Sequence, residues 1–254
     1  MGVDRAAAAS WVAGTTAETY ERGRPGYAGS AVAFVLAPVR DRPGLRALDL
    51  GAGTGKLTRL LVARGVDTVA VEPAAGMREV LARVVPAAAV LPGAAEAVPL
   101  PDSSVDLVVA GQAFHWFERE TALAEIVRVL RPGGVLGIFY NARDDAVAWV
   151  RALSGIIGET ADHASATRDY RPPDLGPRFG PAEVHRTTYE QPLDAGSLVD
   201  LVASRSYSIL MAPAERAALL ARVAELTRTH PALVGRQHFS MPYVTTAERH
   251  ALRS

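Results

Sequence analysis

The stretch Leu48-Asp49-Leu50-Gly51-Ala52-Gly53-Thr54-Gly55 decides the fold. It begins inside the apolar run 46–50, which predicts a buried strand. It leads into residues 54–64, where leucines recur at helical spacing. Glycines at such a junction permit a tight turn and let a ligand approach the backbone at the positive end of a helix. The stretch predicts a ligand-binding strand-to-helix turn, although three glycines alone could also serve only the turn.

Two common nucleotide-binding patterns do not fit this turn. A phosphate-binding P-loop needs a glycine where the chain has Leu50 and a serine or threonine where it has Leu57. The dinucleotide fingerprint needs its third glycine at Lys56, one position later than Gly55. The spacing present is D-x-G-x-G-x-G, beginning at Asp49.

Outward from the turn, short β-rich runs alternate with helical stretches, which is typical of a parallel sheet wrapped by helices. The strands expected after 46–50 are 68–71, 88–91, 105–110 and 135–140, and the helices between them are 75–85 and 121–130. A proline and two glycines at 131–134 end the last of these helices.

The second half of the chain is less regular. It predicts a helix at 146–157, a loop or mobile lid segment at 161–181, a strand at 184–191, helices at 195–209 and 213–229, and a final strand at 239–245.

Composition limits the classes of function. The 254 residues carry 27 basic and 27 acidic side chains, and 49% of the residues are hydrophobic, so one domain with a substantial core is expected. A pI near 7.0 removes the attraction that holds proteins on nucleic acid or an anionic membrane. The absence of cysteine excludes disulfides, thiolate metal sites and a cysteine nucleophile.

Location and metal binding can also be judged from the sequence. Residues 1–10 lack the pattern of a signal peptide and no segment reaches membrane-spanning length without a charge, so a cytoplasmic protein is expected. No metal site is expected, because several histidines lack ligand spacing with nearby carboxylates: His163, His185, His230, His238 and His250.

The glycine turn and three later landmarks resemble the class I S-adenosylmethionine-dependent methyltransferases. Glu72 lies about 20 residues after the first glycine, where a carboxylate accepts hydrogen bonds from ribose hydroxyls. Residues 93–101 resemble the adenine-side segment of the family, and 128–134 resemble its turn after the helix that follows the fourth strand. Taken singly, Glu72 could be a helix-start carboxylate and Glu96 a solvated loop charge. Together, their consistent spacing indicates the cofactor.

The resemblance implies an α/β fold: a doubly wound, Rossmann-like, seven-stranded and mostly parallel sheet, with a helical cap over the carboxyl ends of its strands. It implies a single domain spanning 1–254. The core is expected at 31–145, 184–193 and 236–247, and the cap at 1–30, 146–183 and 194–235.

The same resemblance implies a set of residues that bind S-adenosylmethionine. They are Asp49, Gly51, Ala52, Gly53, Thr54, Gly55, Glu72, Pro73, Met77, Ala95, Glu96, Ala110, Tyr20 and Arg24. Tyr20, Arg24 and Tyr27 are expected to form a lid over the methionine end of the cofactor, since an arginine among aromatics suits a carboxylate partner.

Two further segments resemble a narrower group of small-molecule methyltransferases that includes trans-aconitate methyltransferase. They are residues 20–27 and the run Gln112-Ala113-Phe114-His115-Trp116-Phe117, and the run 242–246 is similar too. Ligands in open α/β sheets bind beyond the carboxyl ends of the strands, and the fourth strand ends at Ala110. Gln112, His115 and Trp116 are therefore expected to act catalytically beside the sulfonium, the alternative being ordinary packing.

The expected activity is methyl transfer to a carboxylate or hydroxyl oxygen of a small organic acceptor. Gln112 and His115 would orient an ionised carboxylate, which needs no base, whereas His115 would take the proton of a phenol or alcohol. The alternative is a non-methylating cyclase or binding protein that uses S-adenosylmethionine as a scaffold. Neither nucleic acid nor membrane is expected as a partner, and a homodimer is left open.

Overall fold

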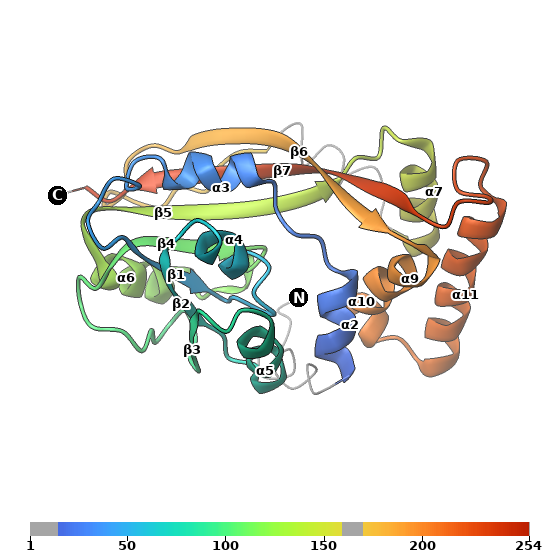
Figure 1. Ribbon diagram of the computed structural model, residues 1–254, viewed down its shortest axis with the longest axis horizontal. Helices are drawn as coiled ribbons and strands as arrows, with labels where there is room; N and C mark the ends of the chain where they lie inside the picture. Colours follow the sequence, from blue (N-terminus) through green and yellow to red (C-terminus); the bar gives the residue numbers. More distant parts are fainter. Residues whose placement is uncertain (1–14, 159–169, 254) are drawn as a thin grey trace.

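The computed structural model describes residues 15–158 and 170–253 and contains a seven-stranded sheet with strand order β3-β2-β1-β4-β5-β7-β6 (Figure 1). The strands are β1 (Arg46–Leu50), β2 (Asp67–Val71), β3 (Ala89–Leu91), β4 (Val105–Gly111), β5 (Leu130–Arg143), β6 (Glu183–Leu193) and β7 (Phe239–Ala251). The expected α/β, doubly wound, seven-stranded fold is confirmed.

The strand directions create the crevice that the fold uses for ligands. β1 pairs in parallel with β2 on one side and with β4 on the other, and β4 pairs in parallel with β5. β7 is antiparallel to both of its neighbours, β5 and β6. Strand order therefore reverses between β1 and β4, and ligands of open α/β sheets bind at the carboxyl ends of the strands beside such a reversal.

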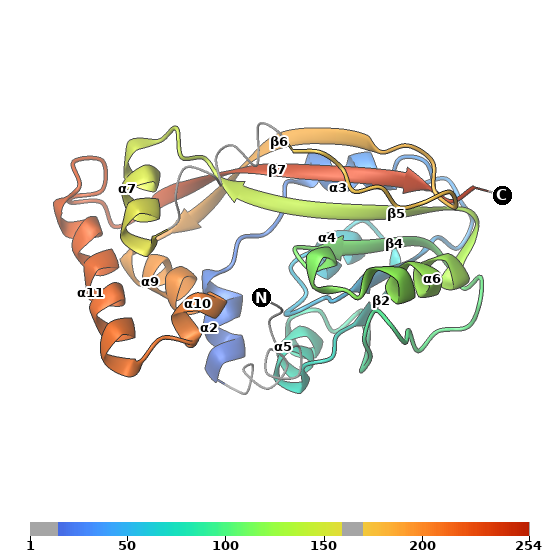
Figure 2. The ribbon, with the colours of Figure 1, turned by 180° about the vertical axis from the view of Figure 1, so that it is seen from behind.

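Helices cover both faces of the sheet. They are α2 (Thr15–Gly23), α3 (Gly29–Leu36), α4 (Thr58–Val62), α5 (Ala75–Val84), α6 (Arg119–Val129), α7 (Ala148–Ile157), α9 (Ala195–Ala203), α10 (Ser206–Ile209) and α11 (Pro213–Thr229). α3 and α4 pack on one face and α6 on the other, as the two opposite views show (Figures 1 and 2). The alternating apolar residues of β4 supply both cores, since Val108 faces α6 and Val109 faces α3.

A helical cap is built on the far ends of β6 and β7. α7, α9 and α11 bury a separate apolar cluster against these strands, with Met241 and Tyr243 from β7 at its base. α2 lies against α9 so closely that a Cβ at Gly23 would come within 2.5 Å of the Leu201 backbone nitrogen. This contact brings the N-terminal segment and the cap together beside the glycine turn (Figure 1).

The helices differ from the expectations in four places. α2 and α3 have no counterpart among the predicted helices, and the helix predicted at 54–64 is confined to Thr58–Val62, because the glycine turn extends further. The helix predicted at 195–209 is broken at Ser204, whose hydroxyl donates to the Leu201 carbonyl and so competes with the helical pattern.

The irregular stretch predicted at 161–181 is described only from residue 170, and its part 161–169 lies outside the described residues. Residues 170–182 form neither helix nor strand, apart from a bridge between Phe179 and Leu252. In the part of the chain that the structure describes, no helix is long and apolar enough to cross a membrane. The division into core and cap residues stays a prediction.

Candidate active site

The glycine turn follows β1 in a conformation that requires glycine. Gly51, Gly53 and Gly55 have φ angles of +69°, +57° and +85°, which side chains disfavour. The N–H groups of Gly51 and Ala52 both donate to the Val71 carbonyl, over 2.9 and 3.1 Å. The turn is therefore bound to the carboxyl end of β2.

Glu72 reinforces this connection. Its Oε2 accepts a hydrogen bond from the Gly53 N–H and its Oε1 accepts one from the Ala74 N–H, both over 2.9 Å. The side chain is buried, and burial raises the pKa of its carboxyl, although the two backbone bonds oppose the rise. Each carboxylate oxygen has a second lone pair, so Glu72 can still accept bonds from the hydroxyls of a ligand.

Asp49 lies beneath the turn and is 1% exposed. Its Oδ2 accepts a 2.6 Å hydrogen bond from the Thr58 hydroxyl at the start of α4. Burial raises the pKa of the Asp49 carboxyl to about 7. Asp49 therefore connects the turn to α4, and near neutral pH about half of it is protonated.

Lys56, the only lysine in the sequence, links the N-terminal helix α2 to the turn. Its Nζ donates to the Glu21 carbonyl over 2.6 Å and lies 3.2 Å from Glu21 Oε1, and Arg59 Nη2 lies 2.6 Å from the same oxygen. Burial would raise the pKa of Glu21, but hydrogen bonds from Thr54 and Arg59 and the charge of Lys56 together lower it. Glu21 is thus held ionised as the joint between α2 and the turn.

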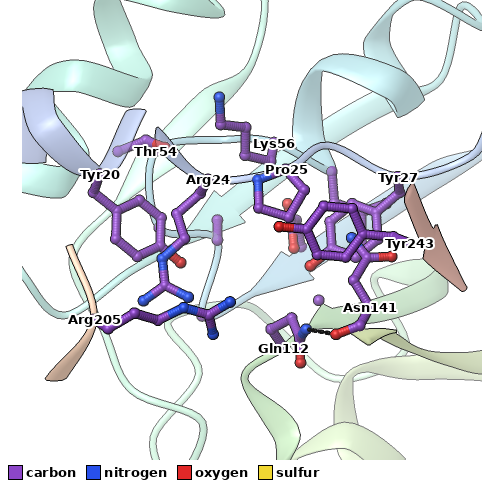
Figure 3. A pocket seen from close by; sticks show the side chains of 16 residues that line it. Tyr20, Arg24, Pro25, Tyr27, Thr54, Lys56, Gln112, Asn141, Arg205 and Tyr243 are labelled. Carbon is purple, nitrogen blue, oxygen red and sulfur yellow. Dashed lines mark hydrogen bonds between the residues drawn. The ribbon is translucent and has the colours of Figure 1, made fainter. Parts of the chain in front are cut away.

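A pocket opens between the turn, the carboxyl ends of β4 and β5, the N-terminal segment and the cap (Figure 3). Its interior volume is about 50 Å³ in this conformation, which is less than the few hundred Å³ of typical small-molecule sites, so a ligand would have to move its walls apart. Its lining residues are Tyr20, Arg24, Pro25, Tyr27, Asp49, Gly51, Ala52, Gly53, Thr54, Lys56, Leu57, Gly111, Gln112, Asn141, Arg205 and Tyr243.

The wall formed by β4 and β5 is tightly built. A Cβ at Gly111 would lie 2.5 Å from the Tyr27 hydroxyl oxygen, so the tyrosine rests directly on the glycine. Gln112 has a φ of +56°, which is uncommon for a residue with a side chain, and its Nε2 donates to the Asn141 carbonyl over 2.8 Å. Asn141 Nδ2 in turn donates to the Gly26 carbonyl over 2.7 Å. These contacts fix Gln112 and the N-terminal segment relative to each other.

The opposite wall carries two arginines. Arg24 lies over the ring of Tyr20, 4.7 Å from its centroid, and its Nη2 donates to the Ser204 carbonyl over 3.0 Å. The Nε atoms of Arg24 and Arg205 are buried without a hydrogen-bond partner in the described structure, as is the hydroxyl of Tyr243. Burial and the neighbouring charge of Arg205 lower the pKa of Arg24 to about 10.

Eight of the seventeen predicted site residues line this pocket: Tyr20, Arg24, Asp49, Gly51, Ala52, Gly53, Thr54 and Gln112. Six others lie near the pocket without lining it. Gly55 and Glu72 belong to or support the turn, Pro73 is exposed next to Glu72, and Met77, Ala95 and Ala110 are buried in apolar clusters. Glu96 is engaged with the backbone, since its Oε1 accepts a 2.6 Å bond from the Glu118 N–H. Their cofactor roles stay predictions.

His115 and Trp116 do not line the pocket. They form the 3₁₀ turn η1 (Phe114–Trp116) after β4, where both are exposed and their ring centroids lie 5.1 Å apart. Partial burial of the imidazole lowers the pKa of His115. Of this segment, Phe117 packs against the glycine turn, 3.4 Å from where a Cβ at Gly51 would be. The catalytic roles of His115 and Trp116 remain untested expectations.

Several pocket residues were not among the predicted site residues. Asn141 follows a predicted strand and Tyr243 lies in the noted run 242–246, so both had a positional signal. Arg205 lies in the cap between α9 and α10, where nothing in the local sequence distinguishes it from the many other arginines. Only the packing of the cap over the turn identifies it.

Comparison with known proteins agrees with this geometry. Residues 48–138 match a family model described as a methyltransferase domain. An uncharacterised methyltransferase of Mycobacterium tuberculosis is 44% identical over 239 residues, which are 94% of this chain and 95% of the relative. A malonyl-[acyl-carrier protein] O-methyltransferase of Methylococcus capsulatus is 42% identical over 143 residues, covering 53% of this chain and 52% of the relative.

A solved structure from Anaeromyxobacter dehalogenans, provisionally assigned as a type II methyltransferase, shares the fold. It has a TM-score of 0.64 and 23% sequence identity, covering 91% of this chain and 97% of the other. A methyltransferase domain implies S-adenosylmethionine as methyl donor, and the positive-φ turn, the lone pairs of Glu72 and the unpartnered Arg24 Nε fit that group. The chain therefore belongs to the class I S-adenosylmethionine-dependent methyltransferases.

Proposed function

We propose that the protein methylates a carboxylate or hydroxyl oxygen of a small organic acceptor held in the pocket of Figure 3. The observation that carries this proposal is the continuity of the pocket. One pocket is lined by the glycine turn and by polar side chains of β4, β5 and the cap, so a donor bound at the turn and an acceptor bound by these side chains would be neighbours. Enclosed sites of this kind exclude water and hold reacting groups in line.

Different residues of the chain would hold the two ends of the cofactor. The backbone of Gly51 to Gly55 and the carboxylate of Glu72 would hold the nucleoside, with Pro73, Met77, Ala95 and Glu96 beside its base and Ala110 at the adjoining end of β4. Tyr20 and Arg24 would hold the methionine end, where the unpartnered Nε of Arg24 can bond a carboxylate. When bound, S-adenosylmethionine supplies a methyl group already activated by its positive sulfur.

The remaining task of the protein is to align the acceptor. Gln112 is suited to it, because its strained backbone and its bond to Asn141 hold its amide in one position on the pocket wall. A carboxylate acceptor is ionised at neutral pH and needs no general base. A hydroxyl acceptor would need one, and His115, which lies outside the pocket lining in this structure, is the proposed base in that case. The O-methyltransferase name of the Methylococcus relative supports oxygen as the methylated atom.

The test is a screen for methylated products. The protein is incubated with S-adenosylmethionine carrying a labelled methyl group and with sets of small acids, phenols, alcohols and amines, and products are found by mass. Transfer of label to the oxygen of an acid, a phenol or an alcohol is expected. Tight binding of S-adenosylhomocysteine with no labelled product from any set, or label only on nitrogen, would contradict the proposal.

A further inference from the structure

Two guanidinium groups face the same pocket, and neither has an acidic partner among residues 15–158 and 170–253. Arg24 bonds only a backbone carbonyl, and Arg205 has no side-chain hydrogen bond or ion pair in the described residues. Figure 3 shows the end of Arg205 pointing toward Gln112, with the guanidinium of Arg24 nearby. The two charges are close enough for Arg205 to lower the pKa of Arg24. Like charges held together in this way indicate an anionic ligand.

The other ionisable groups of the pocket do not neutralise these arginines. Lys56 is occupied by Glu21, and Asp49 is bonded to Thr58 with a pKa near 7. The buried hydroxyl of Tyr243 also lacks a partner, and the charges of Arg205, Arg143 and Arg24 all act on it. Among the described residues that line it, the pocket therefore carries more positive than negative charge.

The cofactor does not remove this excess of positive charge. S-adenosylmethionine carries one carboxylate against one ammonium and one sulfonium, so its net charge is +1. Its single carboxylate can pair with one guanidinium. Arg24 is the better placed of the two, because it stacks on Tyr20, whose ring lies 3.9 Å from where a Cβ at Gly53 would be. Arg205 enters from the cap, between α9 and α10.

We propose that Arg205, with the hydroxyl of Tyr243, binds a carboxylate of the methyl acceptor, so that the acceptor is a small organic acid. A guanidinium can turn two parallel N–H donors toward a planar carboxylate, and a phenol hydroxyl can add a third donor. That the bound acid is the methyl acceptor rests on the proposed function. The anion site itself can be tested by binding alone.

The experiment measures binding to the protein saturated with S-adenosylhomocysteine. Hexanoate, benzoate, succinate and glutarate are titrated by calorimetry, each beside its uncharged amide. We expect at least one acid to bind at least tenfold more tightly than its amide. Arg205→Gln should weaken that binding about tenfold to a hundredfold, the range for a charge-assisted bond, with a smaller loss in Arg205→Lys. Tyr243→Phe should weaken it less than Arg205→Gln.

Controls separate this site from the cofactor's own carboxylate. Arg222→Gln, the same change at an exposed arginine of α11, should leave acid binding unchanged. Arg205→Gln should keep the wild-type affinity for S-adenosylhomocysteine, and Arg24→Gln should lose about tenfold or more. If Arg205→Gln instead lowers the affinity for S-adenosylhomocysteine while acid binding persists, or if no acid binds better than its amide, the proposal is overturned.

Failure of the proposed function would give a different pattern. In that case acids bind through Arg205 but labelled methyl reaches none of them, and the site is an anion site of a non-methylating protein. That outcome overturns the acceptor role of the carboxylate and leaves its binding intact. If wild type forms labelled methyl esters and Arg205→Gln forms far less of them, the result supports both the proposed function and the role of Arg205 in binding the acceptor.

Discussion

The backbone N–H of Gly53 donates to Oε2 of Glu72 over 2.9 Å, so the carboxylate that ends β2 holds the centre of the glycine turn. Its other oxygen accepts from Ala74 at the start of α5. A single buried side chain therefore sets the shape of the turn and, in the proposed site, also receives the ribose. Loss of Glu72 should affect both the order of the turn and the affinity for the cofactor.

Glu72→Ala should weaken S-adenosylhomocysteine binding by tenfold or more and also lower the melting temperature. The first effect reflects two lost hydroxyl bonds, worth on the order of 2–3 kcal/mol. The second reflects two backbone N–H groups left without an acceptor. Calorimetry and thermal unfolding measure the two effects. Glu79→Gln, at an exposed position on α5, is the control. Wild-type affinity in a folded Glu72→Ala protein would remove Glu72 from the site.

Steric contact between Gly111 and Tyr27 should control the shape of the pocket. In Gly111→Ala the new methyl group would lie 2.5 Å from the Tyr27 hydroxyl, and such overpacking costs about 1–3 kcal/mol. We expect methyl transfer to fall by about tenfold or more, because the pocket wall must shift. Adding Tyr27→Phe should restore part of the rate. Gly155→Ala, which meets open space on α7, should change neither rate nor fold. An unaffected Gly111→Ala enzyme would show that this wall does not position the acceptor.

The strands near the turn could be predicted closely because buried parallel strands are short apolar runs ended by glycine or proline. β1 was predicted to the residue, and β2 and β3 to within one residue. The long strands β5, β6 and β7 extend beyond their predictions. The missed part of β7, 246–251, pairs with 135–140 of β5, but polar residues such as Glu248 and His250 interrupt its apolar pattern. α3 was missed because Gly29–Leu36 is apolar on nearly every side and shows no helical period.

The site could be predicted only where it follows a local pattern. The turn and Glu72 lie at fixed spacing, and the structure places them together. The ion pair of Glu21 with Lys56 and the position of Arg205 in the pocket lining depend on how α2 and the cap pack over the turn. Such long-range packing leaves no spacing signal in a single sequence.

The joint between Glu21 and Lys56 predicts that the N-terminal segment closes over the cofactor. S-adenosylhomocysteine should slow tryptic cleavage after Arg22, because the bound ligand holds Tyr20 and Arg24 in place. Glu21→Gln should speed cleavage at this site, since it loses its ion pairs with Lys56 and Arg59. Glu79→Gln should behave as wild type. Cleavage before residue 30 that is equal with and without ligand would count against a lid.

Asp49 should make stability depend on pH. Its pKa is about 7 in the folded protein and near 3.8 when unfolded, so between these values only the folded state keeps the proton. The free energy of unfolding should therefore fall as pH rises from about 4 to 7, by at most about 4 kcal/mol, and stay level above pH 7. Asp49→Asn should remove this slope, whereas Asp67→Asn at an exposed site should not. Urea titrations of wild type and Asp49→Asn at pH 5 and pH 8 measure this dependence. If the free energies of unfolding of the two proteins differ by the same amount at both pH values, the prediction is wrong.

His115 offers the test that separates a carboxylate acceptor from a hydroxyl acceptor. The residue is exposed and outside the pocket lining, and partial burial of its ring lowers its pKa, so it is neutral at pH 7. With a carboxylate acceptor no proton has to be removed. His115→Gln should then keep most of the methyl-transfer rate and show a flat profile between about pH 5.5 and 8, a range that spans the usual histidine pKa of about 6.5.

A hydroxyl acceptor predicts the opposite result. A general base must lose its own proton before it can act, so the wild-type rate would fall on the acid side, below the usual histidine pKa of about 6.5. His115→Gln would remove that limb and lower the rate about a hundredfold or more. Trp116→Phe is the matched control, since it changes the neighbouring ring of η1 without a titrating group. A large loss in His115→Gln but not in Trp116→Phe, together with the missing limb, would show that His115 reaches the acceptor when the site closes. It would also overturn the assignment of the acceptor atom to a carboxylate.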